Sequence, residues 1–368
     1  RAIELGIDYD LRNREQAFMD ESKINPNLVP AFNFNHTFTR FNYFNEALLN
    51  NQLIPFRGPI NKHTLSCAED FNYSIISNDK FGFKNPNSIY DKKIEVMILG
   101  DSYAEGLCYN ENHDIAGNLR KLNFNTGNFG VTGSGPLVAL GVLSEYARKF
   151  KPQTLFYLYF EGNDITDLIW ERNNTNLTKY LQDDYSQDFL LKEKAINNFL
   201  NKISKESYNH IQNNIGNVKN YNQNPKKDLS QQVKDILELT RLKHAIKNLI
   251  FLIYDEDFDK ELFFSTINKM NMETQQWNGK FIFVYVPSWS RYFAKFNKIQ
   301  RYINKKDFIL DELNKKNIAT IDLTKFFNKK NKVKQYFPLG LPGHFNKKGY
   351  KKIAEILEKE MIAINYQQ

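Results

Sequence analysis

Residues 94–102 read IEVMILGDS, and this stretch decides the fold. A short apolar run that ends in a Gly-Asp-Ser turn is typical of a buried parallel strand followed by a helix. Four further strands are expected at 124–129, 155–160, 281–286 and 318–323. Helices are expected at 114–122, at 136–150, near 306–316, and after Asn346 to about residue 363. Alternating strands and helices predict a doubly wound α/β sheet.

Two regions fall outside this alternation. Residues 1–92 are rich in aromatic residues and turn formers and lack a periodic apolar core, so they are expected to form an irregular arm packed on the main domain. Residues 171–260 are polar and rich in Asn and Lys, and are expected to form a mostly helical insertion, with a helix at 229–253 and a loop at 220–227. The main domain is therefore expected to comprise residues 93–170 and 261–368.

The charge of the chain excludes one class of partner. The 368 residues carry a formal charge of +8, but the basic residues are scattered and form no stripe with interleaved aromatic residues. We therefore expect no nucleic-acid partner. No run of 18 or more apolar residues occurs, so no membrane span is expected within the sequence. Because the first residue is Arg1, a signal peptide or membrane anchor upstream remains open.

The two cysteines, Cys67 and Cys108, leave two alternatives open. Buried free thiols and one disulfide are both compatible with the sequence, and a disulfide would indicate an oxidising compartment. The sequence has no Cys/His spacing typical of a metal site and no glycine-rich nucleotide-binding motif after the first strand. We therefore expect neither a metal nor a cofactor.

Four short segments carry the candidate chemistry. They contain Ser102 in GDS, Gly133 in NFGVTGSG, Asn163 in EGND and His344 in GHFN. Each has an ordinary structural explanation, such as a helix cap or a turn. Three of them follow predicted strands, however, and ligands of open α/β sheets bind at the carboxyl ends of the strands. Together they predict one site in which His344 acts as the base for a nucleophilic Ser102.

This set resembles the SGNH/GDSL hydrolase family, whose Ser, Gly, Asn and His blocks match the four residues. The resemblance covers roughly residues 94–170 and 280–363. It implies a three-layer α/β/α domain with a mainly parallel five-stranded sheet of the flavodoxin-like type. It also implies an oxyanion hole formed by the N–H groups of Ser102 and Gly133 and the side-chain amide of Asn163.

One residue departs from the family pattern. The family usually has an Asp three residues before the His, where it orients the imidazole, and this sequence has Leu341 there. Either a Ser–His dyad operates, or another group replaces the Asp. The candidate acids are Glu161, Asp164 and Asp322.

A second resemblance concerns location. Residues 79–86, DKFGFKNP, look like segments that lead into SGNH domains of bacterial envelope proteins. This implies a periplasmic, secreted or membrane-anchored protein in which Cys67 and Cys108 are joined, with a cytoplasmic location as the alternative. Because Cys108 follows Ser102 by six residues, such a bond would hold the arm beside the site.

Three functions are compatible with these features. The first is a serine esterase that removes acyl groups from an ester, for which an envelope glycan is one candidate. The second is a polysaccharide O-acyltransferase that forms the same acyl-enzyme. The third, motivated by the missing Asp, is an inactive glycan-binding or scaffold protein of the same fold. The sequence defines neither the acyl group, nor the acceptor, nor the oligomeric state.

Overall fold

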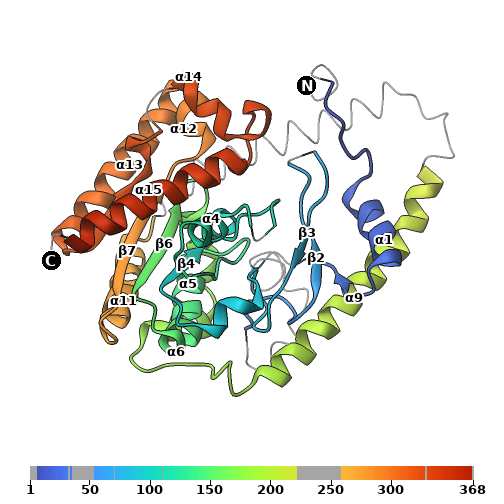
Figure 1. Cartoon of the computed structure of the whole chain (residues 1–368), viewed down its shortest axis with the longest axis horizontal. Coiled ribbons are helices and arrows are strands. Elements are labelled where there is room, and N and C mark those ends of the chain that lie inside the picture. The colour runs from blue at the N-terminus through green and yellow to red at the C-terminus, as the bar shows by residue number, and fades with distance from the viewer. Residues whose placement is uncertain are drawn as a thin grey trace.

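The computed structural model describes residues 6–31, 34, 54–69, 71–110, 112–221, 258–327 and 330–366. Its main sheet has five parallel strands in the order β5-β4-β6-β7-β8 (Figure 1). The strands are β4 (Val96–Gly100), β5 (Thr126–Asn128), β6 (Thr154–Phe160), β7 (Lys280–Val286) and β8 (Ala319–Asp322). The predicted fold class, α/β/α with a parallel five-stranded sheet, is confirmed.

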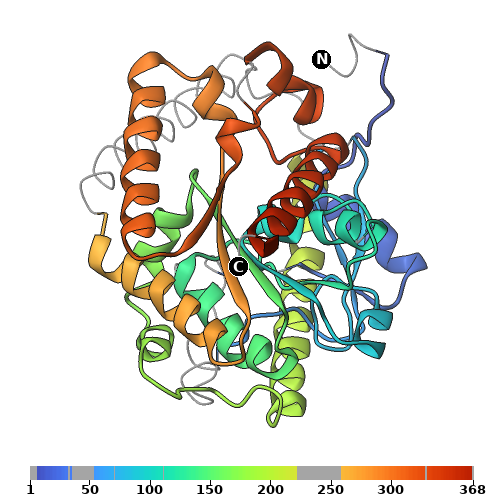
Figure 2. The same cartoon turned by 60° about the vertical axis from the view of Figure 1, so that its left-hand side comes forward.

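Helices cover both faces of this sheet (Figure 2). Tyr157 and Tyr159 of β6 pack in one core with α5 (Pro136–Val142) and α11 (Lys260–Gln275). Phe156 and Leu158 of the same strand pack in a second core with α4 (Ile115–Lys121) and α15 (Lys347–Tyr366). Burial on both faces explains why the central strands are apolar at nearly every position.

The remaining helices lie in the connections and at the edges. They are α3 (Ser102–Glu105), α6 (Arg148–Phe150), α7 (Asp164–Glu171), α8 (Thr175–Thr178), α9 (Glu193–Tyr221), α12 (Trp289–Phe293), α13 (Phe296–Lys315) and α14 (Lys330–Val333). Short 3-10 turns occur at η3 (Asn87–Asp91), η5 (Lys179–Leu181), η6 (Leu323–Lys325), η7 (Lys334–Tyr336) and η8 (Pro338–Gly340). None of the helices in the described part of the chain is long and apolar enough to cross a bilayer.

A π-helical turn, η4 (Leu143–Ala147), joins α5 to α6 and ties the start of the predicted insertion to the main domain. Its buried Glu145 accepts hydrogen bonds from the Tyr180 hydroxyl and the Phe189 N–H, at 2.6 and 3.0 Å. The predicted helix at 229–253 and most of the predicted loop at 220–227 lie outside the described residues.

The N-terminal arm has more regular structure than the sequence predicts. It contains α1 (Arg14–Ile24) and a separate sheet of β1 (Leu28–Val29), β2 (His63–Leu65) and β3 (Ile75–Ser77). A small apolar core lies between them and includes Ala17, Phe18, Leu28 and Leu65. Strands of two or three residues are too short to show an alternating pattern in the sequence.

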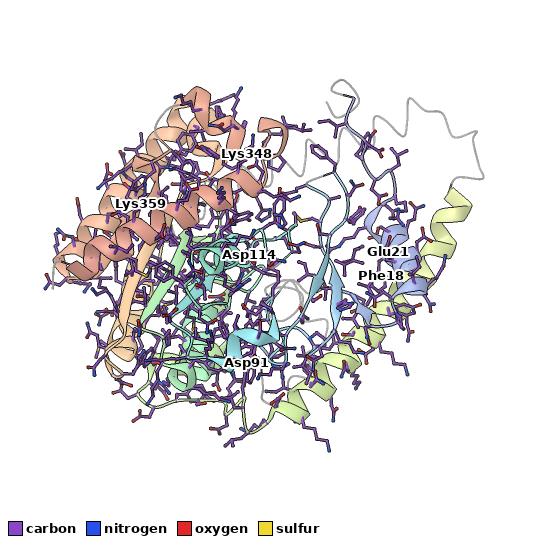
Figure 3. The ribbon with its side chains drawn as sticks, viewed as in Figure 1. Phe18, Glu21, Asp91, Asp114, Lys348 and Lys359 are labelled. Carbon is purple, nitrogen blue, oxygen red and sulfur yellow. A yellow bond between two sulfur atoms is a disulfide. The ribbon has the colours of Figure 1, made fainter. Side chains whose placement is uncertain are left out.

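The arm also contributes to the core of the main domain. Figure 1 shows its sheet beside the main sheet, with α9 running along α1. Phe56, between β1 and β2, is fully buried, and its ring centroid lies 5.6 Å from that of Tyr180 and 5.1 Å from that of Phe189. On the opposite side of the molecule, Lys348 and Lys359 of α15 point into solvent (Figure 3). Most of the buried aromatic residues of the arm, Phe56 among them, belong to the core on the other face of the sheet from α15.

Replacing Phe56 tests whether the arm and the main domain share one core. We expect Phe56→Ala to lower the free energy of unfolding by about 3–5 kcal/mol, because a buried aromatic ring is lost and a cavity remains. Leu191→Ala is the control, since Leu191 is 88% exposed, and should change the free energy by less than about 0.5 kcal/mol. Urea unfolding measures both, and equal small effects would contradict a shared core.

Candidate active site

The turn after β4 places Ser102 at the start of α3. Gly100 has φ +140°, and a Cβ there would lie 2.6 Å from the carbonyl oxygen of Leu158, so only glycine fits this turn. Asp101 caps the helix, because its Oδ1 accepts the N–H of Tyr103 at 2.8 Å. The N–H of Ser102, the first in the helix, has no acceptor within it. Ser102 therefore lies at the carboxyl edge of the sheet with a backbone donor beside its hydroxyl.

His344 reaches Ser102 from the loop before α15. The distance between His344 Nε2 and Ser102 Oγ is 2.8 Å. The Tyr103 hydroxyl donates to the carbonyl of Gly343 at 3.0 Å, and the indole N–H of Trp289 donates to that of Gly340 at 3.1 Å. These bonds hold the loop at both ends of its turn, so the imidazole is fixed against the serine.

The carboxylate beside His344 comes from the arm. Glu69 Oε1 lies 2.9 Å from His344 Nδ1, and Glu69 Oε2 accepts the backbone N–H of His344 at 2.8 Å. Leu341, at the position of the family's Asp, is 44% exposed. Glu69 therefore lies beside the imidazole, where the family's Asp is expected, although it is 275 residues away from His344 along the chain.

The ionisation of Glu69 fixes the proton on the imidazole. Burial by itself would raise the pKa of Glu69, but the hydrogen bonds and charge of His344 outweigh it and hold the pKa below its ordinary value of 4.5. An ionised carboxylate only accepts hydrogen bonds, so the imidazole proton lies on Nδ1. The lone pair of Nε2 then faces the hydroxyl of Ser102, which is the arrangement a general base requires.

The three acids considered from the sequence bind elsewhere, which corrects that prediction. Glu161 forms an ion pair with Arg291, with 2.5 Å between its Oε2 and Nη2. Asp164 accepts the Tyr157 hydroxyl at 2.9 Å, and burial together with the charge of Asp101 raises its pKa. Asp322 pairs with Lys306. These partners hold each carboxylate away from the imidazole, and among the described contacts none reaches His344.

Two further residues were predicted to donate to an oxyanion. Gly133 has φ +73°, a backbone conformation that favours glycine, and is only half-buried. Asn163 immediately precedes α7, and its Nδ2 donates to Asp167 Oδ2 at 2.6 Å. The Asn163 amide is therefore next to the site but engaged with a carboxylate. Burial raises the pKa of the neighbouring Asp101 to about 6, although the Tyr103 N–H and His344 oppose this.

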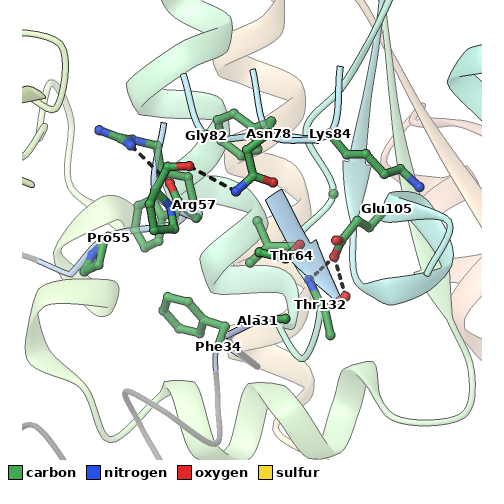
Figure 4. Close-up of a pocket in the computed structure, with 16 residues that line it drawn as sticks. Ala31, Phe34, Pro55, Arg57, Thr64, Asn78, Gly82, Lys84, Glu105 and Thr132 are labelled. Carbon is green, nitrogen blue, oxygen red and sulfur yellow. Dashed lines mark hydrogen bonds between the residues drawn. The ribbon is translucent and has the colours of Figure 1, made fainter. Parts of the chain in front are cut away.

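The loop that carries Gly133 is held from both sides. Glu105, three residues after Ser102, accepts the hydroxyl and the N–H of Thr132, the latter at 2.9 Å (Figure 4). From the arm, the N–H of Phe34 donates to the carbonyl of Thr132 at 2.9 Å. A cavity of about 70 Å³ between arm and loop is lined by both sets of residues. The arm thus contacts the loop that carries Gly133.

Cys67 and Cys108 are joined by a disulfide. Cys67 lies two residues before Glu69, and Cys108 lies six residues after Ser102. Cys67, Glu69 and Cys108 also form a group of candidate metal ligands with atoms within 4.8 Å of one another, but both sulfurs are in the disulfide. Sequence reasoning missed Glu69, and its proximity to Cys67 is the signal that could have found it.

No known protein-family model matches the sequence, and no curated protein matches it either. One solved structure, described as "Structure of a putative lipolytic protein of G-D-S-L family from Desulfitobacterium hafniense DCB-2", is similar over 71% of this chain and 96% of its own. The sequence identity is 13% and the TM-score is 0.37. At this level the likeness carries neither a family nor an activity over to this chain.

The contact between Glu69 and His344 should make stability depend on pH. Since the pKa of Glu69 lies below its ordinary value of 4.5, its contribution is fully present above that pH and is lost as the pH falls through the lowered pKa. The wild type should therefore exceed Glu69→Gln in free energy of unfolding at about pH 7, and this difference should shrink at about pH 3.5. The exposed Glu15→Gln is the control. Urea unfolding at both pH values measures this, and a difference that is independent of pH would contradict it.

Proposed function

We propose that this protein is a serine carboxylic-ester hydrolase of the SGNH/GDSL type, with Ser102 as nucleophile, His344 as general base and Glu69 as the residue that orients it. The observation that carries the proposal is the continuous line of contacts from Glu69 through both ring nitrogens of His344 to Ser102, at 2.9 and 2.8 Å. The matched order of the Ser, Gly, Asn and His segments supports the same family.

The chemistry proceeds through an acyl-enzyme. Ser102 Oγ attacks the ester carbonyl carbon while its proton passes to His344 Nε2. The tetrahedral intermediate collapses, the C–O bond to the alcohol breaks, and His344 returns the proton to the leaving alkoxide. Water then attacks the acyl-enzyme by the same route and releases the acid. Glu69 stays ionised throughout and stabilises the imidazolium that forms in each half-reaction.

The negative charge that develops on the carbonyl oxygen of the substrate has to be stabilised by hydrogen-bond donors. The N–H groups of Ser102 and Gly133 are the backbone candidates, and the Asn163 amide is the third. Each such donor contributes about 3–4 kcal/mol to transition-state stabilisation. Because Asn163 Nδ2 bonds to Asp167 in this structure, the proposal requires that amide to turn, or to share its second proton, when substrate binds.

The disulfide supports a location outside the cytoplasm, since disulfides persist in oxidising compartments. It therefore favours the periplasmic, secreted or membrane-anchored location expected from the sequence, with an ester of the cell envelope, such as an acylated glycan, as the substrate class. The proposal of an inactive scaffold loses its motivation, because Glu69 supplies the carboxylate whose absence suggested it.

Removing the nucleophile is the direct test of the proposal. With p-nitrophenyl acetate as substrate, Ser102→Ala should lower kcat by on the order of 10⁴–10⁶-fold, because the acyl-enzyme cannot form. A fluorophosphonate should label the wild type at Ser102 and leave the variant unlabelled. Ser77→Ala, at an exposed serine of β3, is the matched control and should keep wild-type turnover. Unchanged turnover in Ser102→Ala would remove Ser102 as the nucleophile.

Acyl transfer to a sugar hydroxyl is the second candidate function. The observation that favours it is the burial of the serine: Ser102 is only 9% exposed, Glu69 of the arm lies against His344, and the arm also contacts Thr132, next to Gly133. Restricting water at an acyl-enzyme favours another acceptor.

The two functions differ in the fate of the acyl group. With p-nitrophenyl acetate and an oligosaccharide present together, a hydrolase should release acetate at a rate that the sugar does not change. A transferase should acetylate the sugar and release p-nitrophenol faster as the sugar concentration rises. Product analysis by mass spectrometry distinguishes the two, with Ser102→Ala as the blank in both cases.

A further inference from the structure

The acid of the site belongs to a different sheet from the nucleophile. Glu69 lies in the loop between β2 and β3, and the sheet of β1, β2 and β3 shares no strand pairing with the main sheet in the described part of the chain. Strand pairing therefore fixes Ser102 but does not fix Glu69 relative to it. Catalytic groups require placement to within about 0.5 Å, so another connection has to set this distance.

The disulfide provides a short covalent path between them. Along the chain, Ser102 lies 33 positions after Glu69. Through the sulfurs, the path runs from Ser102 over six positions to Cys108 and from Cys67 over two positions to Glu69. Only Ala68 stands between Cys67 and Glu69. A path of this length leaves the Glu69 backbone little freedom to move away from the serine.

The Cys108 end of this path is firmly held. Cys108 is fully buried, its carbonyl accepts the Ser74 hydroxyl at 2.8 Å, and its N–H donates to Ser66 Oγ at 3.0 Å. The loop around it is fixed further by buried Lys84, whose Nζ donates to the carbonyls of Gly106 and Tyr109 at 2.8 and 3.1 Å.

Lys84 is itself anchored to a helix of the main domain. Its Nζ lies 3.1 Å from Asp114 Oδ2, and both side chains are buried. Asp114, near the centre of Figure 3, also caps α4 through the N–H of Gly117. None of these contacts depends on the sulfur–sulfur bond, so the loop around Cys108 should keep its position when that bond is cut.

At the Glu69 end, the tip of the loop has fewer contacts than its base. The base of this loop is closed by the bond from the Ser66 N–H to the Ser74 carbonyl, at 2.8 Å, and its tip by the bond from the Phe71 N–H to the Ala68 carbonyl, at 3.0 Å. The base is also held to Cys108 by the side chains of Ser66 and Ser74. Across to the main domain, Glu69 is joined through the two hydrogen bonds with His344. These bonds hold the carboxylate only while the loop stays in place.

We propose that Cys67 and Cys108 are positioning residues, whose disulfide sets Glu69 on His344 and makes catalysis depend on oxidation of this pair. The inference rests on the proposed function. Reduction by a phosphine converts the disulfide into two thiols, with water supplying the oxygen that ends on phosphorus and the two protons that end on sulfur. The base of the loop stays held at Cys108 by Ser66 and Ser74, but its tip loses the covalent link two residues from Glu69. The carboxylate can then leave the imidazole, while Ser102 and His344 remain on the main domain.

The test combines reduction with removal of the acid. We measure kcat for p-nitrophenyl acetate in the wild type and in Glu69→Gln, each oxidised and each treated with tris(2-carboxyethyl)phosphine and a chelator. In the oxidised state, Glu69→Gln should lower kcat by on the order of 10³–10⁴-fold. Reduction should lower kcat of the wild type by on the order of 10²-fold, because a misplacement of about 1 Å costs that much.

The decisive comparison is the effect of reduction in the variant. Without the carboxylate there is nothing left to misplace, so reduction should change kcat of Glu69→Gln by less than about twofold. Cys67→Ser with Cys108→Ser should reproduce the reduced wild type, and reoxidation of the reduced wild type should restore its rate. An equal loss in both backgrounds would show that the disulfide supports the whole structure, and an unchanged wild type would show that it does not position Glu69. Either result overturns the inference.

A second readout separates this inference from the proposed function. The pH-dependent difference in unfolding free energy between wild type and Glu69→Gln reports the Glu69–His344 contact without any turnover. Reduction should abolish that difference at about pH 7. If no ester is hydrolysed, the proposed function fails while this measurement still decides the inference, and a difference that survives reduction overturns it.

Discussion

The pair of hydrogen bonds between Glu69 and His344 is the contact on which the proposed site depends, because it brings a carboxylate of the N-terminal arm to an imidazole of the main domain. The Glu69 carboxylate is ionised and only accepts hydrogen bonds, so the imidazole proton lies on Nδ1 and the lone pair of Nε2 faces Ser102. Further contacts join the arm to the main domain. They include the packing of Phe56 in the main core and the disulfide between Cys67 and Cys108.

The proposed acid, nucleophile and base lie together in space but far apart in the sequence. In the proposed mechanism the acid comes first along the chain, then the nucleophile, then the base, whereas the resemblance to the SGNH/GDSL family implies an acid and a base in one short segment. A triad is defined by geometry, and unrelated chain orders give the same one. Because the proposed acid lies in the arm, the turn before His344 needs no carboxylate, and Leu341 at the position of the family's Asp is exposed.

Much of this could be read from the sequence, for identifiable reasons. The five main strands are buried on both faces, so their apolar runs are continuous and their existence was evident, with ends displaced by a few residues. Ser102 and His344 stand in short, recognisable segments. The arm was harder, because β1 to β3 are two or three residues long and their pairing partners are distant in sequence. Glu69 was missed because its one local signal, its position two residues after Cys67, has meaning only once Cys67 is known to pair with Cys108.

The core that Phe56 shares with Tyr180 and Phe189 bears on how such proteins are divided into parts. A fragment of residues 93–368 would contain every segment that a motif search recognises, and its sequence would look like that of a complete domain. It would lack a carboxylate, half of a covalent link and a piece of its own interior. For this chain, the segment that supplies the proposed triad is longer than the segment that contains the recognisable motifs. Recombination at the boundary between arm and main domain would therefore yield the main fold with an incomplete active site.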